Sequence, residues 1–221
     1  EGGNLNAHGR RLAHLGVHPR LAQLLVRSCE LGAVDLGCGL AALLSERDPL
    51  SQLEAGSDLM RRLDWLRSAG RDPRRQQLRQ LQQQLRRQLP EHLHAEAPAE
   101  LEAAVAAELL AHAYPERVAL ERTPGSGRYL TRSGRGAVLH TDDPLVACPA
   151  LAVAQLDGQG QDARIQLAIP IDIGQLRQLA EQPGGQGNIA VEARWDGEGQ
   201  RVRCERSLRL GALVLERRSW S

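Results

Sequence analysis

The stretch R-I-Q-L-A-I-P-I (residues 164–171) alternates large apolar side chains with other side chains at a period of two. Its three isoleucines and one leucine would share one face of a β-strand, because successive side chains point to opposite faces. The same period recurs in I-A-V-E-A-R-W (189–195) and R-V-R-C-E (201–205). Turn signals rich in Asp and Gly, at 157–160 and 196–199, separate these runs. This part of the chain is therefore predicted to be a small β-structure.

Towards the N-terminus the period changes from two to about 3.6. From residue 6 to about residue 113, leucines recur three and four positions apart, which indicates amphipathic helices. Pro19, Pro73 and Pro98 suit the first turn of a helix, where the missing N–H costs nothing. Gly32 is expected to end one helix, and Ser57 is expected to cap the start of another.

The two periodicities predict an α+β fold with two domains. Residues 1–112 are expected to form a helical bundle, and residues 113–221 a small antiparallel β-barrel of the OB-like kind. A partly open five-stranded barrel with one inserted helix fits the second half well. The expected short elements are strands near 118–121, 129–131, 137–139 and 150–156, and a helix at about 174–180.

The basic residues exclude two kinds of chemistry. All 28 are arginine, so the chain has no lysine for a Walker A phosphate loop or for a Schiff base. Neither G-x-x-x-x-G-K-[ST] nor a D-E-x-H box occurs, so we expect this chain to be catalytically inactive as an ATP hydrolase. The formal net charge of +1 means that any nucleic-acid site must be a local patch.

The cysteine content and hydropathy of the chain bear on the cellular location of the protein. Four scattered cysteines without C-x-x-C spacing indicate free thiols, and thus a reducing cytoplasm. No apolar run approaches the roughly 20 residues of a membrane span, so no membrane partner is expected. The opening Glu1-Gly2-Gly3-Asn4 lacks an initiator methionine, which we interpret as a piece of a longer polypeptide.

Arginines in the helical half are the first candidates for binding. Arg20, in H-P-R (18–20), can contact a nucleic-acid phosphate or another domain, or it can bond within the chain at a helix corner. Arg74, Arg75 and Arg79 lie on one helical face with two further arginines. That face either contacts nucleic acid or a partner protein or is simply solvated.

A glycine-rich hairpin in the second half supplies the other candidates, Arg128, Tyr129, Arg132 and Arg135. In the functional interpretation Tyr129 stacks on a base and the arginines contact phosphates. In the alternative, the hairpin is solvated and Tyr129 packs inside the barrel. Histidines, cysteines and the Asp142-Asp143 pair lack the spacing of a metal site, and no catalytic triad is visible, so we assign no metal and no catalytic residue.

Several motifs, in order along the chain, resemble a known family. N-A-H-G-R-R-L-A-H-L-G-V-H-P-R-L (6–21) resembles the helicase-associated segment of DEAH-box helicases. L-A-A-L-L-S-E-R-D-P-L (40–50), A-Y-P-E-R-V-A (113–119), G-R-Y-L-T-R-S-G-R-G-A-V-L (127–139) and L-G-A-L-V-L (210–215) resemble its HrpB branch. Asn6 and Gly16 depart from the usual Thr and Pro. Each motif is weak alone, and their collinear order makes the match specific.

The resemblance implies a role in an ATP-dependent RNA helicase. The parent protein would carry two RecA-like motor domains, which use ATP and Mg²⁺, and a winged-helix domain. This chain would supply a ratchet-like helical bundle and an OB-like barrel that guide single-stranded RNA, and it would need no cofactor itself. Two alternatives stay open: a protein-interaction scaffold without nucleic-acid binding, and an independent hydrolase.

Overall fold

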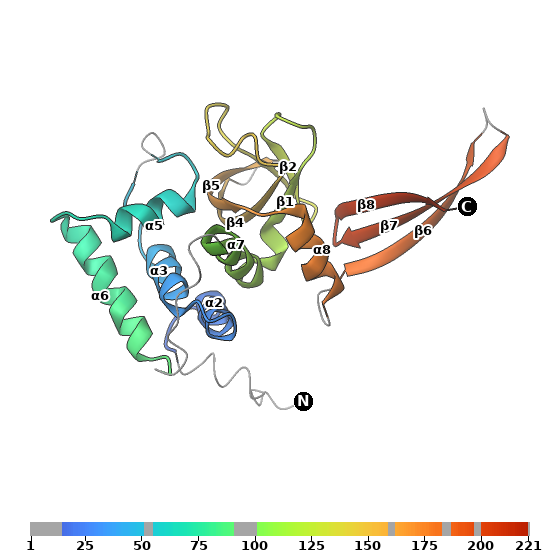
Figure 1. The fold of residues 1–221 in the computed structure, drawn as a ribbon. Helices are drawn as coiled ribbons and strands as arrows, with labels where there is room; N and C mark the ends of the chain where they lie inside the picture. Colours follow the sequence, from blue (N-terminus) through green and yellow to red (C-terminus); the bar gives the residue numbers. More distant parts are fainter. Residues whose placement is uncertain are drawn as a thin grey trace.

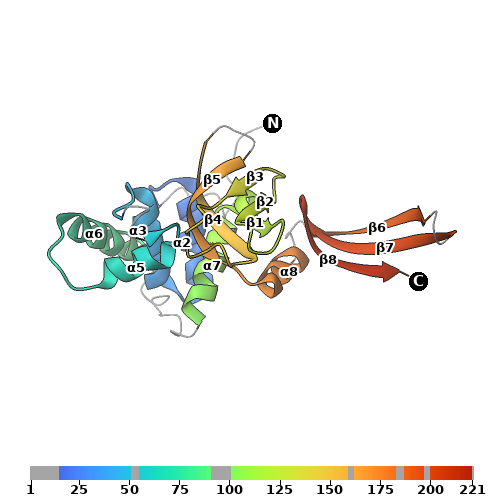
Figure 2. The same cartoon turned by 90° about the horizontal axis from the view of Figure 1, so that it is seen from above.

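The structure, a computed structural model, describes residues 15–50, 55–90, 101–158, 162–182, 187–196 and 200–220. Helices lie at one end of the molecule, a β-barrel lies in the middle, and a three-stranded sheet projects from the other end (Figures 1 and 2). The helices before the barrel are α2 (Pro19–Glu30), α3 (Val34–Ser45), α5 (Leu59–Arg67), α6 (Pro73–Arg87) and α7 (Glu102–Ala113).

Local signals set the start of two helices as predicted. Pro19 and Pro73 each occupy the first turn, of α2 and α6 respectively. The side chain of Asp72 accepts a hydrogen bond of 2.8 Å from the N–H of Arg74, which satisfies one of the free donors of the α6 terminus. Gly32 follows α2 with φ of 63°, a left-handed conformation that favours glycine at a helix end.

The prediction that Ser57 caps a helix is wrong. Asp58 is the N-cap of α5, and its side chain accepts a 2.8 Å bond from the N–H of Met60. Ser57 instead bonds to the barrel, because its N–H donates to Asp143 at 2.7 Å and its hydroxyl donates to the carbonyl of Ile165 at 3.0 Å. The expected helix starts at Asn6 and Pro98 lie outside the described residues.

Five strands close into a barrel in the order β1-β2-β3-β5-β4. They are β1 (Val118–Glu121), β2 (Arg128–Thr131), β3 (Gly136–Val138), β4 (Ala150–Asp157) and β5 (Asp162–Pro170). All neighbours are antiparallel except β3 and β5, which are parallel. The α+β fold with a small barrel is thus confirmed, with two corrections: the barrel is closed, and it is not purely antiparallel.

The last three strands form a separate antiparallel sheet, which differs from the expectation of a single barrel. They are β6 (Gly187–Asp196), β7 (Arg201–Leu210) and β8 (Leu213–Trp220), and α8 (Ile173–Glu181) precedes them. A closed barrel offers no free edge for a further strand, so these strands pair with one another. Strands β6 and β7 pair without a register shift from Gly187–Leu210 to Asp196–Arg201.

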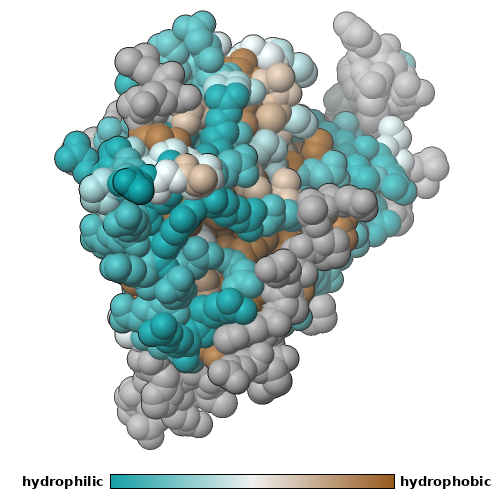
Figure 3. Space-filling view, turned by 60° about the vertical axis from the view of Figure 1, so that its left-hand side comes forward, coloured by the Kyte–Doolittle hydropathy of each residue, from teal (hydrophilic) through white to brown (hydrophobic). Residues whose placement is uncertain are grey.

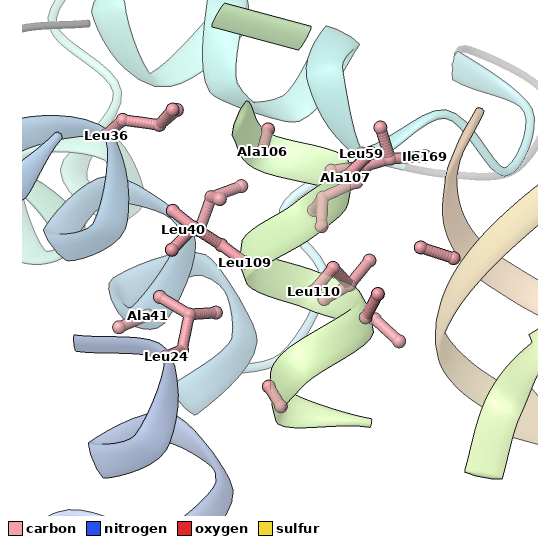
Figure 4. Close-up of a cluster of buried hydrophobic side chains, with 14 of the residues drawn as sticks. Leu24, Leu36, Leu40, Ala41, Leu59, Ala106, Ala107, Leu109, Leu110 and Ile169 are labelled. Atoms are coloured by element: carbon pink, nitrogen blue, oxygen red, sulfur yellow. The ribbon is translucent and has the colours of Figure 1, made fainter. Parts of the chain in front are cut away.

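One apolar core runs through the helices and into the barrel. Figure 4 shows side chains of α2, α3, α5 and α7 gathered with Ile169 of β5 in this cluster. Leu24, Leu40 and Leu109 in it are fully buried. Helix α7 therefore packs between the other helices and the barrel. The division into domains near residue 113 stays a prediction, since the helices and the barrel share this core.

Candidate nucleic-acid interface

Two adjoining hollows lie between the helices and the barrel. The larger has a volume of about 860 Å³ and is lined by residues 46–50 and Arg74 from the helical side and by 155–157 and Gln166 from the barrel. The smaller has a volume of about 300 Å³. Its lining comprises Gly56, Ser57, Arg61, His140, Asp142, Asp143, Pro144, Arg164, Ile165 and Gln166. Because Gln166 lines both hollows, we treat them together as the junction groove.

A buried arginine holds the helical wall of the junction groove. Arg62 of α5 is 1% exposed and donates three hydrogen bonds to the carboxylate of Asp48, at 3.2, 3.2 and 2.8 Å. It donates two more to the carbonyls of Ala55 and Asp58. We call the hydrogen bonds from Arg62 to Asp48 the fork between these residues. The fork positions the loop after α3, and this loop places Arg47 in the lining of the groove.

Contacts between the residues just before α5 and the loop after β3 determine the shape of the smaller hollow. The carboxylate of Asp143 accepts from the N–H groups of Ser57 and Leu145, so its negative charge is satisfied inside the protein. Gly56 has φ of 57°, and a Cβ there would lie 2.6 Å from Pro144. Only glycine therefore permits this close approach of the two walls.

The junction groove presents both signs of charge to solvent. Arg47, Arg61 and Arg164 are exposed along it. The exposed carboxylates are Glu46, Asp142 and Asp157. Two of these groups form weak pairs with neighbouring residues: Arg61 lies 3.9 Å from Asp58, and Asp142 lies 3.6 Å from His140. Such a lining suits reversible contact with a polar polymer better than tight binding of a small apolar ligand.

The predicted helical arginines have three different environments. Arg74 lines the junction groove, is 63% exposed and pairs with Asp72 at 3.0 Å. Arg75 is 8% exposed, with its guanidinium 4.5 Å from the ring centre of Trp65. Arg79 donates to three carbonyls at the end of α5. The prediction that Arg75 contacts RNA at the surface is therefore wrong, because its side chain is buried on Trp65.

Arg20 bonds within the chain. Its guanidinium pairs with Glu116 at 2.7 Å and lies 5.1 Å from the ring centre of Tyr114. These contacts join the start of α2 to the corner between α7 and β1.

Figure 3 shows hydrophilic side chains over most of the helical face of the molecule, with apolar ones between them.

The candidate residues of the hairpin do not form one cluster. Tyr129 is fully buried, and its hydroxyl donates to the carbonyls of Cys148 at 2.8 Å and Leu145 at 3.2 Å. Burial raises the pKa of this hydroxyl far above its usual range. The prediction that Tyr129 stacks on a base is wrong, because its ring packs inside the barrel.

Two of the three hairpin arginines, Arg128 and Arg135, bond to separate partners. Arg128 is 62% exposed and pairs with Asp162 at 2.8 Å, and Arg135 donates to the carbonyl of Gly158. Partial burial lowers the pKa of Arg132. Arg128 thus links β2 to the start of β5, and Arg135, just before β3, bonds to the residue after β4. Their contact with nucleic acid stays a prediction.

Sequence reasoning missed Arg47, Arg61 and Arg164, which share the groove with Arg74. A signal existed for Arg164, since it occupies an outward position in the alternating stretch of β5. No comparable signal marked Arg47, because its position depends on the long-range fork between Arg62 and Asp48.

Other kinds of site were also sought in the described ranges. There, no group of three or more His, Cys, Asp or Glu side chains is placed to hold a metal ion. None of the helices in the same ranges has the length and apolar character needed to cross a membrane. Cys29, Cys38, Cys148 and Cys204 all carry free thiols, as expected.

Comparisons with known proteins give one consistent result. No family model matches the sequence. The ATP-dependent RNA helicase HrpB of Escherichia coli (strain K12) is 30% identical over 219 residues, which is 98% of this chain and 24% of that protein. The chain therefore spans about a quarter of the length of this relative.

Solved structures agree with the sequence comparison. The crystal structure of the E. coli DExH-box NTPase HrpB matches all of this chain and 25% of its own, with a TM-score of 0.76 and 30% identity. The crystal structure of the Escherichia coli DEAH/RHA helicase HrpB matches with a TM-score of 0.75 and 25% identity, again over all of this chain and 25% of its own. The expected resemblance is confirmed: over nearly its whole length, and in its fold, this chain is similar to a segment of an HrpB-type helicase.

Proposed function

We propose that this chain is the accessory region of an ATP-dependent RNA helicase and that it guides single-stranded RNA along the junction groove. The observation on which this proposal depends is the groove itself. It runs between a helical bundle and a small barrel, with Arg47, Arg61, Arg74 and Arg164 along it. The similarity to HrpB supports the helicase context.

The barrel supports this proposal through its architecture. Five strands in the order β1-β2-β3-β5-β4 form a small closed barrel, which favours an OB-type assignment. Barrels of that type bind single strands through a positive groove and through stacking. The exposed carboxylates beside the arginines would keep each contact weak, so that a strand can be released and advanced.

The wider context is part of the same proposal. Motor domains elsewhere in the parent protein would bind ATP and Mg²⁺, and they would contact this chain together with a winged-helix domain. The bundle, residues 1–112, and the barrel region, residues 113–221, would act as two domains. A cytoplasmic location fits the free thiols.

Fluorescence anisotropy with a labelled oligouridylate tests the proposal. The chain should bind weakly, and its affinity should fall steeply as salt rises from about 50 to about 200 mM. The double variant Arg47→Gln with Arg164→Gln removes two groove charges. It should weaken binding and lower the salt slope by about 1.4, because each phosphate contact on a single strand contributes about 0.7.

A matched control makes the same charge change away from the groove. Arg71 and Arg87 are exposed and line neither hollow, so the double variant Arg71→Gln with Arg87→Gln should retain the salt slope of the parent chain. Equal losses in both double variants would mean that net charge, rather than the junction groove, governs binding. Absence of binding at the lowest salt would refute the proposal and favour the scaffold alternative.

A further inference from the structure

The β6–β8 sheet exposes an unusual number of large apolar side chains. Ile189, Val191, Trp195 and Val202 are 54%, 58%, 67% and 59% exposed. The first three lie on one face of β6 because they are an even number of residues apart. Val202 of β7 pairs directly with Trp195 and so shares that face. Figures 1 and 2 both show this sheet projecting away from the barrel beyond α8.

The same sheet concentrates positive charge in a nearly neutral chain. Its 28 residues contain seven arginines and four carboxylates, a difference of +3, while the whole chain has a formal charge of +1. The arginines are Arg194, Arg201, Arg203, Arg206, Arg209, Arg217 and Arg218. The rest of the chain therefore sums to −2, so an anionic polymer would be attracted to this sheet in particular.

Two of these arginines lie on the face that carries Trp195 and Val202, which we call the apolar face. Arg206 of β7 pairs with Val191 on one side and with Arg218 of β8 on the other. Both are exposed, and Arg218 also forms an ion pair with Glu216. Two guanidinium groups side by side on an exposed face can donate together to one phosphate.

The base of the sheet is firmly attached to the body. Leu210, Leu213 and Leu215 are buried in the main core. The N–H of Ala212 donates to the carbonyl of Arg132 at 3.0 Å, and Gly211 has φ of 58° where a Cβ would lie 2.5 Å from that carbonyl. The apolar face is therefore presented from a fixed support, which lowers the entropic cost of binding.

We propose that this face of the β6–β8 sheet is a second binding site for single-stranded nucleic acid, distinct from the junction groove. A base stacks on Trp195, with Val202 beside it, and backbone phosphates contact Arg206 and Arg218, which lie next to Val191. Arg206 lies four residues beyond Val202 on β7, or about 13 Å along the strand. One strand can thus contact the ring and the arginines together. That the ligand is a single-stranded nucleic acid rests on the proposed function, whereas the position of the site on the β6–β8 sheet does not.

The test uses the whole 221-residue chain and the same labelled oligouridylate. Trp195→Ala should weaken binding about tenfold, and Trp195→Phe should restore most of the affinity, because stacking needs an aromatic face. Arg206→Gln with Arg218→Gln should lower the salt slope by about 1.4. The control is Leu101→Ala, which removes a side chain of similar exposure, 55%, outside the sheet and should not change affinity.

The outcomes separate this inference from the proposed function. If Trp195→Ala binds like the parent chain while the junction-groove variant loses affinity, the second site is refuted and the proposed function stands. If the parent chain does not bind RNA, both fail. If Trp195→Ala abolishes self-association in sedimentation but leaves RNA affinity unchanged, the face is a protein contact and the inference is wrong. Because Trp195 is exposed, its variants should melt at the temperature of the parent chain.

Discussion

Removing the carboxylate of Asp48 should destabilise this protein through the buried guanidinium of Arg62. Arg62 donates five hydrogen bonds, and three of them reach Asp48. Asp48→Ala leaves two bonds and an uncompensated charge on a side chain that is 1% exposed. Breaking a buried pair by removing one partner costs about 3–5 kcal/mol.

The lower end of that range applies here. The side chain of Asp48 is 23% exposed, so water can partly solvate the vacated position. We expect a loss of about 3 kcal/mol, which corresponds to about 6–12 °C in melting temperature for a chain of this size. Urea denaturation followed by circular dichroism measures the change as a shift in midpoint at a constant m value.

Asp64→Ala is the matched control for this measurement. Asp64 lies on the same helix, α5, and is exposed, so its removal should change stability by no more than about 0.5 kcal/mol. If Asp48→Ala and Asp64→Ala unfold at the same urea concentration, the fork between Arg62 and Asp48 does not stabilise the loop as we argue. The explanation for the position of Arg47 in the junction groove would then fail with it.

Two further predictions concern buried polar groups. Tyr129→Phe removes the hydroxyl that donates to Leu145 and Cys148. We expect the free energy of unfolding, measured with urea, to fall by about 1 kcal/mol and RNA affinity to stay unchanged. A marked loss of affinity would contradict the buried position of Tyr129. Burial, and then the charge of Arg27, lower the pKa of His112 from its ordinary 6.5. The unfolded chain then binds more protons than the folded one, so stability should fall as pH decreases below about 6.5. Urea midpoints between pH 7 and 5 measure this, and His112→Gln should flatten the profile; a profile equally steep in the variant would show that other groups cause it.

Two helix starts and several strand positions were predictable because they depend on neighbouring residues. Pro19 and Pro73 restrict the backbone of the residues around them, and both begin helices as expected. The strand predicted at 118–121 matches β1, and the helix predicted at about 174–180 lies within α8. Alternation and proline placement act over a few residues, so they can be read along the chain.

The candidate site was predicted less well, because residue type does not reveal burial. Arg74, Arg75 and Arg79 form one basic face in sequence, yet Arg75 packs on Trp65 and Arg79 bonds the end of α5. Tyr129 occupies an inward position of β2 and finds its partners 16 and 19 residues away. Arginine and tyrosine both combine an apolar body with a polar tip, so they suit either surface or interior.

Periodicity and proline chemistry were thus sufficient to predict an α+β chain, helices first, with a small barrel after them. Tertiary contacts alone decided which strands close the barrel, that β6, β7 and β8 form a sheet of their own, and where the junction groove lies. The bond from Ser57 to Asp143 joins residues 86 positions apart, and no local pattern encodes it. Local backbone preferences choose the elements, whereas the burial of apolar faces and the pairing of buried polar groups choose how those elements meet.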